Sequence, residues 1–513
     1  MAETRGVKTG AEWVRALQQG RAACPLIAVA VLAVYWPALD HPFQYDDIHS
    51  IVDNPHLRTL AHIDDFFWRS DMFSADPKGG MYRPLVLVSY AINYAADGYR
   101  VIGYRLFNIA VHLTCALLLW GLLRRLTSSA AAALAGGLLF ALHPVAGEPV
   151  NYISSRSESL CALFVLAGLV CHISYRQGGG VGACWRVVAA FAGALLAKSV
   201  GIVMPLALLV CDLASRSRPW RWRDQVSYYL PYVLVGGAYV IWVRQALQTA
   251  LVDHPVRNLS IQVATQCKAL VYYLKLLAVP WGQSVEHPFA LAQSWDDAAV
   301  WSAVLLVGSM VYGLWRFSKT CPEVAFWVIW PALFLLPTMI VPLNVLVNEH
   351  RLYIPVMGWA VSMVGSLLWT RQKQAGPILG VLIVLMGALA VQRSQVWRSP
   401  TALWTDAQAK GPLMPRPHLY LGDEYKVAGH NEEALKSYER ALTINPSLLS
   451  GGDRLVIHNN TGAAYIALGR NEEAEAAYRR ALAIDPDYSP AREALEALVA
   501  IRASAWHPIA ETR

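Results

Sequence analysis

The sequence has few charged residues and lacks the short motifs of several large enzyme classes. Charged side chains make up 15% of the 513 residues, whereas a soluble globular protein carries about 25%. No Walker A motif, GxSxG, HExxH or Rossmann glycine pattern occurs, so nucleotide-driven transport and serine hydrolysis have no support. The eight cysteines are scattered and form no CxxC pair. This pattern argues for buried, unpaired cysteines and against disulfides or cysteine metal sites.

Long apolar stretches are abundant instead, and they indicate a multi-pass membrane protein. The chain is 55% hydrophobic and has 19 tryptophans, a residue enriched at membrane interfaces. A helix needs about 20 apolar residues to cross a bilayer. We therefore predict an all-α fold that contains a bundle of about eleven spans. They are 23–39, 106–123, 129–142, 158–175, 186–197, 200–213, 226–246, 298–315, 322–341, 352–370 and 377–392.

Lysine and arginine gather in alternate loops, which predicts the orientation. Basic loops stay in the cytoplasm, so we place the N-terminus there and expect a retained first span, because no small-residue cleavage site follows it. We split 186–213 at Lys198, since an unpaired lysine is costly inside hydrocarbon. The odd number of spans then puts the C-terminus on the opposite, periplasmic side of a cell inner membrane. The stretch 261–279 carries Lys268 and Lys275 on one face and is predicted to be an interfacial helix.

The segment 400–513 is more polar and contains an internal repeat. Two stretches match at an offset of 40 residues, with about six residues inserted relative to the tetratricopeptide repeat (TPR) of about 34 residues. The matching pairs are Gly422 and Gly462, Tyr425 and Tyr465, Tyr438 and Tyr478, and Pro446 and Pro486. We predict TPR repeats at about 416–449 and 456–489, followed by a closing helix at about 489–503. Such repeats offer a peptide-binding surface, and a plain docking module is an equal alternative.

Four polar groups lie in or beside loops that the predicted threading brings to one side of the membrane. They are Tyr45-Asp46-Asp47, His143 to Glu148, Lys198, and Glu349-His350-Arg351. Asp46 or Asp47 is a candidate general base, although a polar cap on a helix end explains the pair slightly better. His143, Glu148 and Arg156 form one polar loop. A lone histidine such as His143 usually has a structural role. Glu148 and Arg156 strengthen a functional role for the loop, although the three side chains could equally stabilise each other.

Several cations could serve an anionic substrate on the same side. Arg351 has the forked geometry that matches phosphate oxygens, and Lys198 is a second cation. The alternative for both is an internal salt bridge to Glu148, Glu349 or an aspartate. Arg83, with Trp68 upstream, could hold a sugar or order the first outer loop, and ordering is the safer interpretation.

Taken in order, these motifs resemble a known family. They are Phe43-x-Tyr-Asp-Asp, Asn54-Pro, Trp68, Tyr82-Arg-Pro-Leu85, Phe107-Asn108, His112, LLFALHPVAGEPV, Ser-Arg156-Ser-Glu, Leu-Ala-Lys198, Glu349-His-Arg-Leu-Tyr353 and the TPR repeats. The set resembles the transmembrane-and-tetratricopeptide protein O-mannosyltransferases and, more broadly, the GT-C glycosyltransferases. The family's eukaryotic members carry more repeats, which favours a bacterial chain here.

The resemblance implies an inverting transfer of a sugar, with mannose as one candidate, from a polyprenyl-phosphate donor to Ser or Thr hydroxyls of exported proteins. It implies Asp46 as the base with Asp47 beside it, and Glu148 in the catalytic loop. It implies Arg351, Lys198 and Arg156 at the donor phosphate, where cations stabilise the charge of the leaving group. His143, Arg83, Glu349 and His350 would support the site. We expect no metal ligands and no obligatory cofactor, with a divalent metal left as an open alternative.

The sequence also departs from the family pattern. Ser199 follows the lysine where an acidic residue is usual, Ala146 replaces the second histidine of the HPxH loop, and His350 separates Glu349 from Arg351. These differences concern the identity of the sugar and the binding of the donor phosphate. We expect two domains, a GT-C-like membrane domain at 1–399 with a first outer loop at 40–105, and a TPR domain at 400–513 that recruits the acceptor. A lipid or polysaccharide acceptor and a non-enzymatic membrane scaffold are the alternatives, and nucleic acid is not an expected partner.

Overall fold

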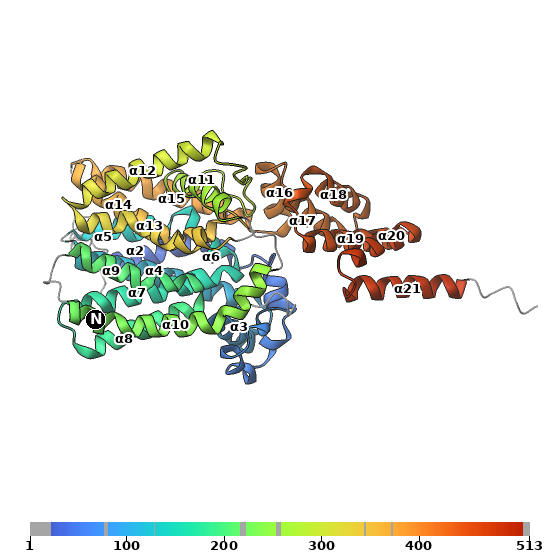
Figure 1. The fold of residues 1–513 in the computed structure, drawn as a ribbon, viewed down its shortest axis with the longest axis horizontal. Helices are drawn as coiled ribbons and strands as arrows, with labels where there is room; N and C mark the ends of the chain where they lie inside the picture. Colours follow the sequence, from blue (N-terminus) through green and yellow to red (C-terminus); the bar gives the residue numbers. More distant parts are fainter. Residues whose placement is uncertain are drawn as a thin grey trace, which may run out of the picture. The chain divides into compact units, whose positions relative to one another are not determined.

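The computed structural model describes residues 22–75, 81–127, 129–215, 222–252, 258–342, 345–370 and 373–505. Within these ranges the chain forms helices and short helical turns and no β-strand (Figure 1), as the predicted all-α class requires. Internal contacts divide it into two units, Met1–Gln283 with Ala290–Arg398, and Ser284–Phe289 with Ser399–Arg513. The division at residue 398 lies one residue from the boundary expected from the sequence. The basic segments 1–21 and 216–221 and Arg371 lie outside the described residues.

The first unit contains a helix at the position of each predicted span. These are α2 (Ala23–Tyr35), α4 (Val101–Leu126), α5 (Ala130–Ala141), α7 (Arg156–Arg176), α8 (Gly180–Ala197), α9 (Met204–Ser215), α10 (Trp222–Val252), α12 (Ala298–Ser318), α13 (Pro322–Ile340), α14 (Pro355–Thr370) and α15 (Ala375–Val396). By length and composition, seven helices of the described chain suit a membrane crossing, and α5 with its bent continuation Pro144–Asn151 makes an eighth. The apolar helices Ala23–Ala38, Ser199–Ser215 and Pro355–Trp369 are shorter. The unit is therefore a multi-pass membrane bundle.

The predicted break at Lys198 is present. Helix α8 ends at Ala197, a 3-10 turn covers Ser199–Val203, and α9 begins at Met204. Gly201 makes the tight return possible, because a Cβ atom there would lie 2.7 Å from the carbonyl carbon of Ala194. The break places the lysine at the junction of two helices rather than inside one.

Helix α11 (Leu259–Ala278) lies beside α12 (Figure 1) and is not among the candidate spans. Lys268 on α11 pairs with Asp297, with 3.1 Å between Nζ and Oδ2. Its predicted position on the membrane surface stays a prediction. The first loop, between α2 and α3 (Pro84–Asp97), consists of short helical turns. Asn54 ties two of them together, because its side-chain amide donates to the carbonyl groups of Ser50 and Met72.

The second unit consists of paired helices, and its packing explains the repeat. Its helices are α16 (Pro400–Lys410), α17 (Pro415–Val427), α18 (Asn431–Ile444), α19 (Gly451–Ala467), α20 (Asn471–Ile484) and α21 (Ser489–Ala505). A Cβ atom on Gly422 would lie 2.5 Å from the Tyr438 ring, and one on Gly462 would lie 2.7 Å from the Tyr478 ring. In each repeat, the glycine therefore lets the first helix pack closely against the tyrosine of the second helix. Between the two repeats, a 3-10 turn covers Pro446–Leu448, and Ser450 and Asp453 form the capping box that begins α19.

Candidate active site

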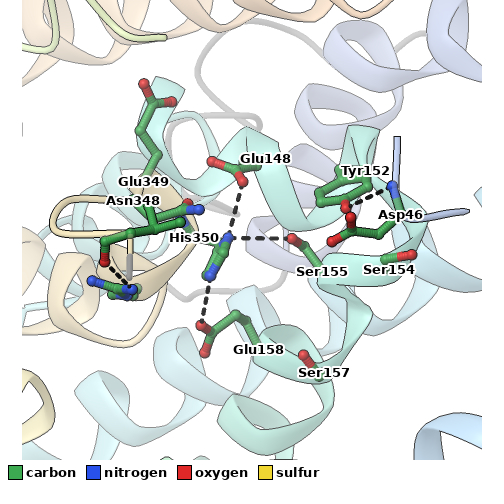
Figure 2. Close-up of polar contacts among 12 residues, drawn as sticks. Asp46, Glu148, Tyr152, Ser154, Ser155, Ser157, Glu158, Asn348, Glu349 and His350 are labelled. Carbon is green, nitrogen blue, oxygen red and sulfur yellow. Dashed lines mark hydrogen bonds and ion pairs between the residues drawn. The ribbon is translucent and has the colours of Figure 1, made fainter. Parts of the chain in front are cut away.

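Two glutamates lie on either side of His350 (Figure 2). The Nδ1 atom of His350 is 3.0 Å from Oε1 of Glu148, and its Nε2 atom is 3.9 Å from Oε1 of Glu158. Ser155 Oγ is also 3.5 Å from Nδ1. Glu148 begins the short helix α6 (Glu148–Asn151), Glu158 lies in the first turn of α7, and His350 lies in the turn Glu349–Leu352. Segments that are about 200 residues apart in the sequence thus meet at one imidazole.

Lys198 extends this group into a chain of four side chains. Its Nζ atom contacts Oε1 of Glu158, and both side chains are largely buried, with 15% and 4% exposure. Burial lowers the pKa of His350 well below its usual value, and the nearby charges of Lys198 and Arg351 add to this effect against the opposing charge of Glu158. His350 is therefore neutral near pH 7 and has one N–H to donate. The 3.0 Å contact assigns that donor to Nδ1, with Glu148 as the acceptor.

Asp46 and Asp47 are adjacent in the sequence but lie in different environments. Asp47 is fully buried. Its Oδ1 atom accepts from the backbone N–H and the hydroxyl group of Ser154, at 2.7 Å each, and its Oδ2 atom accepts from the N–H of Gln44. Asp46 keeps 46% of its side chain exposed. Asp47 therefore fastens the first loop to the 153–155 turn, and Asp46 is the carboxylate that solvent or a substrate can reach.

The protonation of Asp46 is set by its neighbours. Partial burial on its own raises the pKa of the Asp46 carboxyl group, but hydrogen bonds from His49 and Tyr152 and the charge of His49 hold the pKa below its usual value. His49 Nε2 lies 3.5 Å from Oδ1 of Asp46. Asp46 also donates its backbone N–H to the Tyr152 hydroxyl group at 3.2 Å (Figure 2). Asp46 is consequently an ionised, half-exposed carboxylate at neutral pH.

The backbone before Asp46 is strained. Tyr45 has a φ angle of +54°, the only positive φ at a non-glycine position among the described residues. A bulky residue in this conformation costs about 1–3 kcal/mol and persists only where surrounding contacts impose it. The Tyr45 ring lies 6.0 Å from the Tyr152 ring. Such strain is concentrated at functional sites, and here it occurs at the residue directly before Asp46.

Two arginines lie close to the cluster. Arg351 donates to the carbonyl groups of Val345 and Leu346 and to the Tyr273 hydroxyl group. Arg83 donates to Ser157 Oγ at 3.3 Å. Both are near enough that their charges help to lower the pKa of His350. The structure thus brings Lys198, Arg83 and Arg351 to one region, each with a partner from the protein.

Arg156 does not fit the donor-phosphate role that the sequence predicts. It is fully buried, and each guanidinium nitrogen donates within the protein. The acceptors are Asn108 Oδ1, Ser89 Oγ, Asn93 Oδ1 and the carbonyl group of Tyr104. The guanidinium also packs on the rings of Tyr90 and Phe107, at 4.9 and 4.3 Å. Arg156 therefore organises the core beneath the site, because it is fully buried and four of its five N–H groups already donate within the protein.

His143 and Glu349 also support the fold rather than line the site. His143 is buried, accepts from the N–H of Val145 through Nδ1 and lies 3.1 Å from the Leu277 carbonyl group through Nε2. Glu349 points away from His350 (Figure 2) and contacts the side chains of Gln283 and Arg393. In the described part of the chain, no three His, Cys, Asp or Glu side chains converge so as to hold a metal ion. The expected independence of a cofactor stays a prediction.

Sequence reasoning missed Glu158, Tyr152 and His49 as site residues. Tyr152 lies between Glu148 and Arg156, Glu158 lies two residues after Arg156, and His49 lies three residues after Asp46. An (i, i+3) pair of Asp and His is a weak signal that could have been noticed.

Comparison with known proteins finds relatives that are all named protein O-mannosyl-transferases. A tetratricopeptide repeat model matches residues 417–487. A protein O-mannosyl-transferase of Caenorhabditis elegans is 25% identical over 443 residues, which cover 82% of this chain and 62% of the relative. The protein O-mannosyl-transferase TMTC4 of Mus musculus is 24% identical over 492 residues, with coverages of 80% and 65%. The chain thus spans less than two thirds of the length of these relatives.

A third relative, the protein O-mannosyl-transferase Tmtc3 of Drosophila melanogaster, is 25% identical over 538 residues, with coverages of 85% and 56%. Among solved structures, the crystal structure of ArnT from Cupriavidus metallidurans bound to undecaprenyl phosphate aligns with a TM-score of 0.41 and 13% identity. The alignment covers 92% of this chain and 80% of that one. The names of the relatives confirm the resemblance predicted from the sequence motifs.

Proposed function

We propose that this chain is an integral membrane glycosyltransferase that transfers a sugar from a polyprenyl-phosphate donor to Ser or Thr hydroxyl groups of exported proteins. Its relatives are named protein O-mannosyl-transferases, which supports a mannose donor and a protein acceptor. The polar cluster beside the first loop supplies a base and cations, the two kinds of group that this reaction needs. The tetratricopeptide repeats would recruit the acceptor and raise its local concentration.

Asp46 is the base in this proposal. The acceptor hydroxyl oxygen attacks the anomeric carbon of the sugar, and Asp46 takes the hydroxyl proton. The bond between the anomeric carbon and the phosphate oxygen breaks, and the polyprenyl phosphate leaves with the electron pair. Attack on the face opposite the leaving group inverts the anomeric configuration. The observation that carries the proposal is the contrast between the ionised, half-exposed Asp46 and the buried Asp47.

The leaving phosphate gains negative charge, and cations nearby stabilise it. Lys198, Arg83 and Arg351 are the candidates, because all three lie near His350. Lys198 is a compact cation whose present partner is the single carboxylate of Glu158. Arg351 already donates to two carbonyl groups, so fewer of its N–H groups can bind the phosphate. Lys198 and Arg83 therefore form the core of the phosphate site.

The test is transfer by the purified full-length protein in nanodiscs. Radiolabelled polyprenyl-phosphate sugars are offered with an extract of exported proteins, and wild type is compared with Asp46→Asn. Loss of a general base lowers the rate by about 10²- to 10⁴-fold, so we expect labelled protein with wild type and almost none with the variant. Label on a lipid or polysaccharide would replace the protein acceptor. No label on any fraction, from folded protein, would favour a membrane scaffold.

A further inference from the structure

A cleft of about 370 Å³ lies between the first loop and the last part of α10. Trp68, Ser70 and Tyr82 line it from the loop, and Trp242 and Arg244 line it from the helix. Its volume lies in the range of small-ligand sites and suffices for a few amino-acid side chains. The site around Asp46 does not include any of these residues.

Two exposed tryptophans line the cleft. Trp68 is 69% exposed and Trp242 is 49% exposed, and their rings meet edge to face at 5.7 Å. The Tyr82 hydroxyl group donates to the carbonyl group of Phe67 at 2.9 Å, which fixes the backbone beside Trp68. Fixed, exposed tryptophans next to an arginine are the side chains that dominate binding surfaces.

The cleft adjoins the proposed active site through one residue. Arg83 directly follows Tyr82 and reaches Ser157, the neighbour of Glu158 in α7. The loop that carries Trp68 and Tyr82 is also the loop that carries Asp46. Arg83 and the first loop thus connect the cleft to the site around Asp46.

We propose that this cleft binds the acceptor polypeptide next to its target Ser or Thr. An aromatic or large apolar side chain of the acceptor packs against Trp68 and Trp242, and an acidic side chain pairs with Arg244. The inference rests on the proposed function, because it takes the acceptor to be a protein.

A donor lipid tail fits the cleft less well than a polypeptide. The polar groups of Ser70 and Arg244 would lose their contact with water against a hydrocarbon chain, and an isoprenoid offers them no hydrogen bond in return. The exposed apolar side chains on other turns of α10, such as Val233 and Leu234, suit the bilayer. A peptide has both the apolar and the polar groups that the cleft can match.

The test measures peptide binding without transfer, in full-length Asp46→Asn protein in nanodiscs and without donor. Fluorescently labelled Ser/Thr peptides are compared with and without an aromatic residue, and with and without an acidic residue, near the target. We expect Trp68→Ala and Trp242→Ala to weaken binding of the aromatic peptide by about tenfold or more. Arg244→Gln should abolish the preference for the acidic peptide. Trp281→Ala is the matched control, because Trp281 is also 69% exposed but lies outside the cleft.

Equal binding by the Asp46→Asn protein and by both tryptophan variants made in it would overturn the proposal, as would an equal loss with Trp281→Ala or the absence of binding to the Asp46→Asn protein. Loss of affinity for undecaprenyl phosphate in Trp68→Ala, with peptide binding intact, would assign the cleft to the lipid instead. Transfer to peptides that does not depend on Trp68 would overturn the cleft and leave the proposed function standing. Peptide binding at the cleft, with no transfer by wild type under any condition, would overturn the proposed function and leave the cleft as a peptide-binding site.

Discussion

The ammonium group of Lys198 contacts the carboxylate of Glu158, which lies 40 residues earlier in the chain. Both side chains are largely buried, so each neutralises a charge that would be costly alone. If Lys198 binds the donor phosphate, as we propose, the phosphate must compete with Glu158 for it. His350 Nε2 lies 3.9 Å from the same carboxylate oxygen, but in the tautomer that donates from Nδ1 it has no proton to offer Glu158 in place of Lys198.

We therefore expect Glu158→Gln to tighten the binding of undecaprenyl phosphate, by about tenfold for a gain near 1.4 kcal/mol. The variant should also be less stable without the ligand, because Lys198 is left unpaired, and should regain stability when the ligand is saturating. Binding titrations and thermal unfolding in nanodiscs measure both effects. Glu148→Gln is the control, since Glu148 contacts His350. Unchanged or weaker binding in Glu158→Gln would remove Lys198 from the phosphate site.

A second prediction concerns the pH dependence of transfer. Asp46 must be deprotonated to act as a base, so the rate falls as the pH drops through the pKa of Asp46. His49 lowers this pKa through a hydrogen bond and its charge. Removing it in His49→Ala should raise the pKa and shift the acidic limb of the kcat/KM profile to higher pH. His62→Ala is the matched control, because His62 pairs with Asp65 at the same (i, i+3) spacing in the same loop. The same acidic limb in wild type and His49→Ala would contradict Asp46 as the base.

Asp47 gives a prediction on stability. Its carboxylate accepts three hydrogen bonds from Ser154 and Gln44, and a hydrogen bond to a charged group contributes about 1.5–3 kcal/mol. Asp47→Asn turns one acceptor oxygen into a donor that faces other donors. We expect a clear fall in the unfolding temperature, whereas Asp46→Asn should leave it nearly unchanged. Thermal unfolding of the two variants side by side is the measurement, and the opposite order would reverse the roles assigned to the two aspartates.

The membrane bundle is predictable from the sequence because each span is a run of apolar residues bounded by polar ones. The break at Lys198 follows from the cost of a lysine in hydrocarbon, and the repeat follows from the glycine–tyrosine pairs. The meeting of Glu148, Lys198 and His350 is also predictable, since loops on one side of a bundle can meet.

The partners of individual side chains are not predictable in this way. Glu158 lies at the start of a predicted span, and the sequence does not say which face of the helix it occupies. Arg156 has the chemistry of a phosphate ligand, but its acceptors lie 48 to 67 residues away in the chain. Only the packing of α3 and α4 against α7 brings them to it. Residue type thus identifies the groups able to bind a phosphate, and tertiary structure decides which of them are already occupied.

The orientation of the bundle leads to a last prediction, made from the distribution of basic residues. Basic loops stay in the cytoplasm, and the break between α8 and α9 at Lys198 makes the number of predicted crossings odd. A phosphatase that is active only after export should therefore be active when fused after residue 513. A fluorescent protein that folds only in the cytoplasm should be bright when inserted after Lys319, in a basic loop between α12 and α13. If α8 and α9 together crossed the membrane only once, as one span, the number of crossings would be even and the later loops would change sides. The phosphatase fusion would then be silent, and the repeats would lie across the membrane from the proposed base.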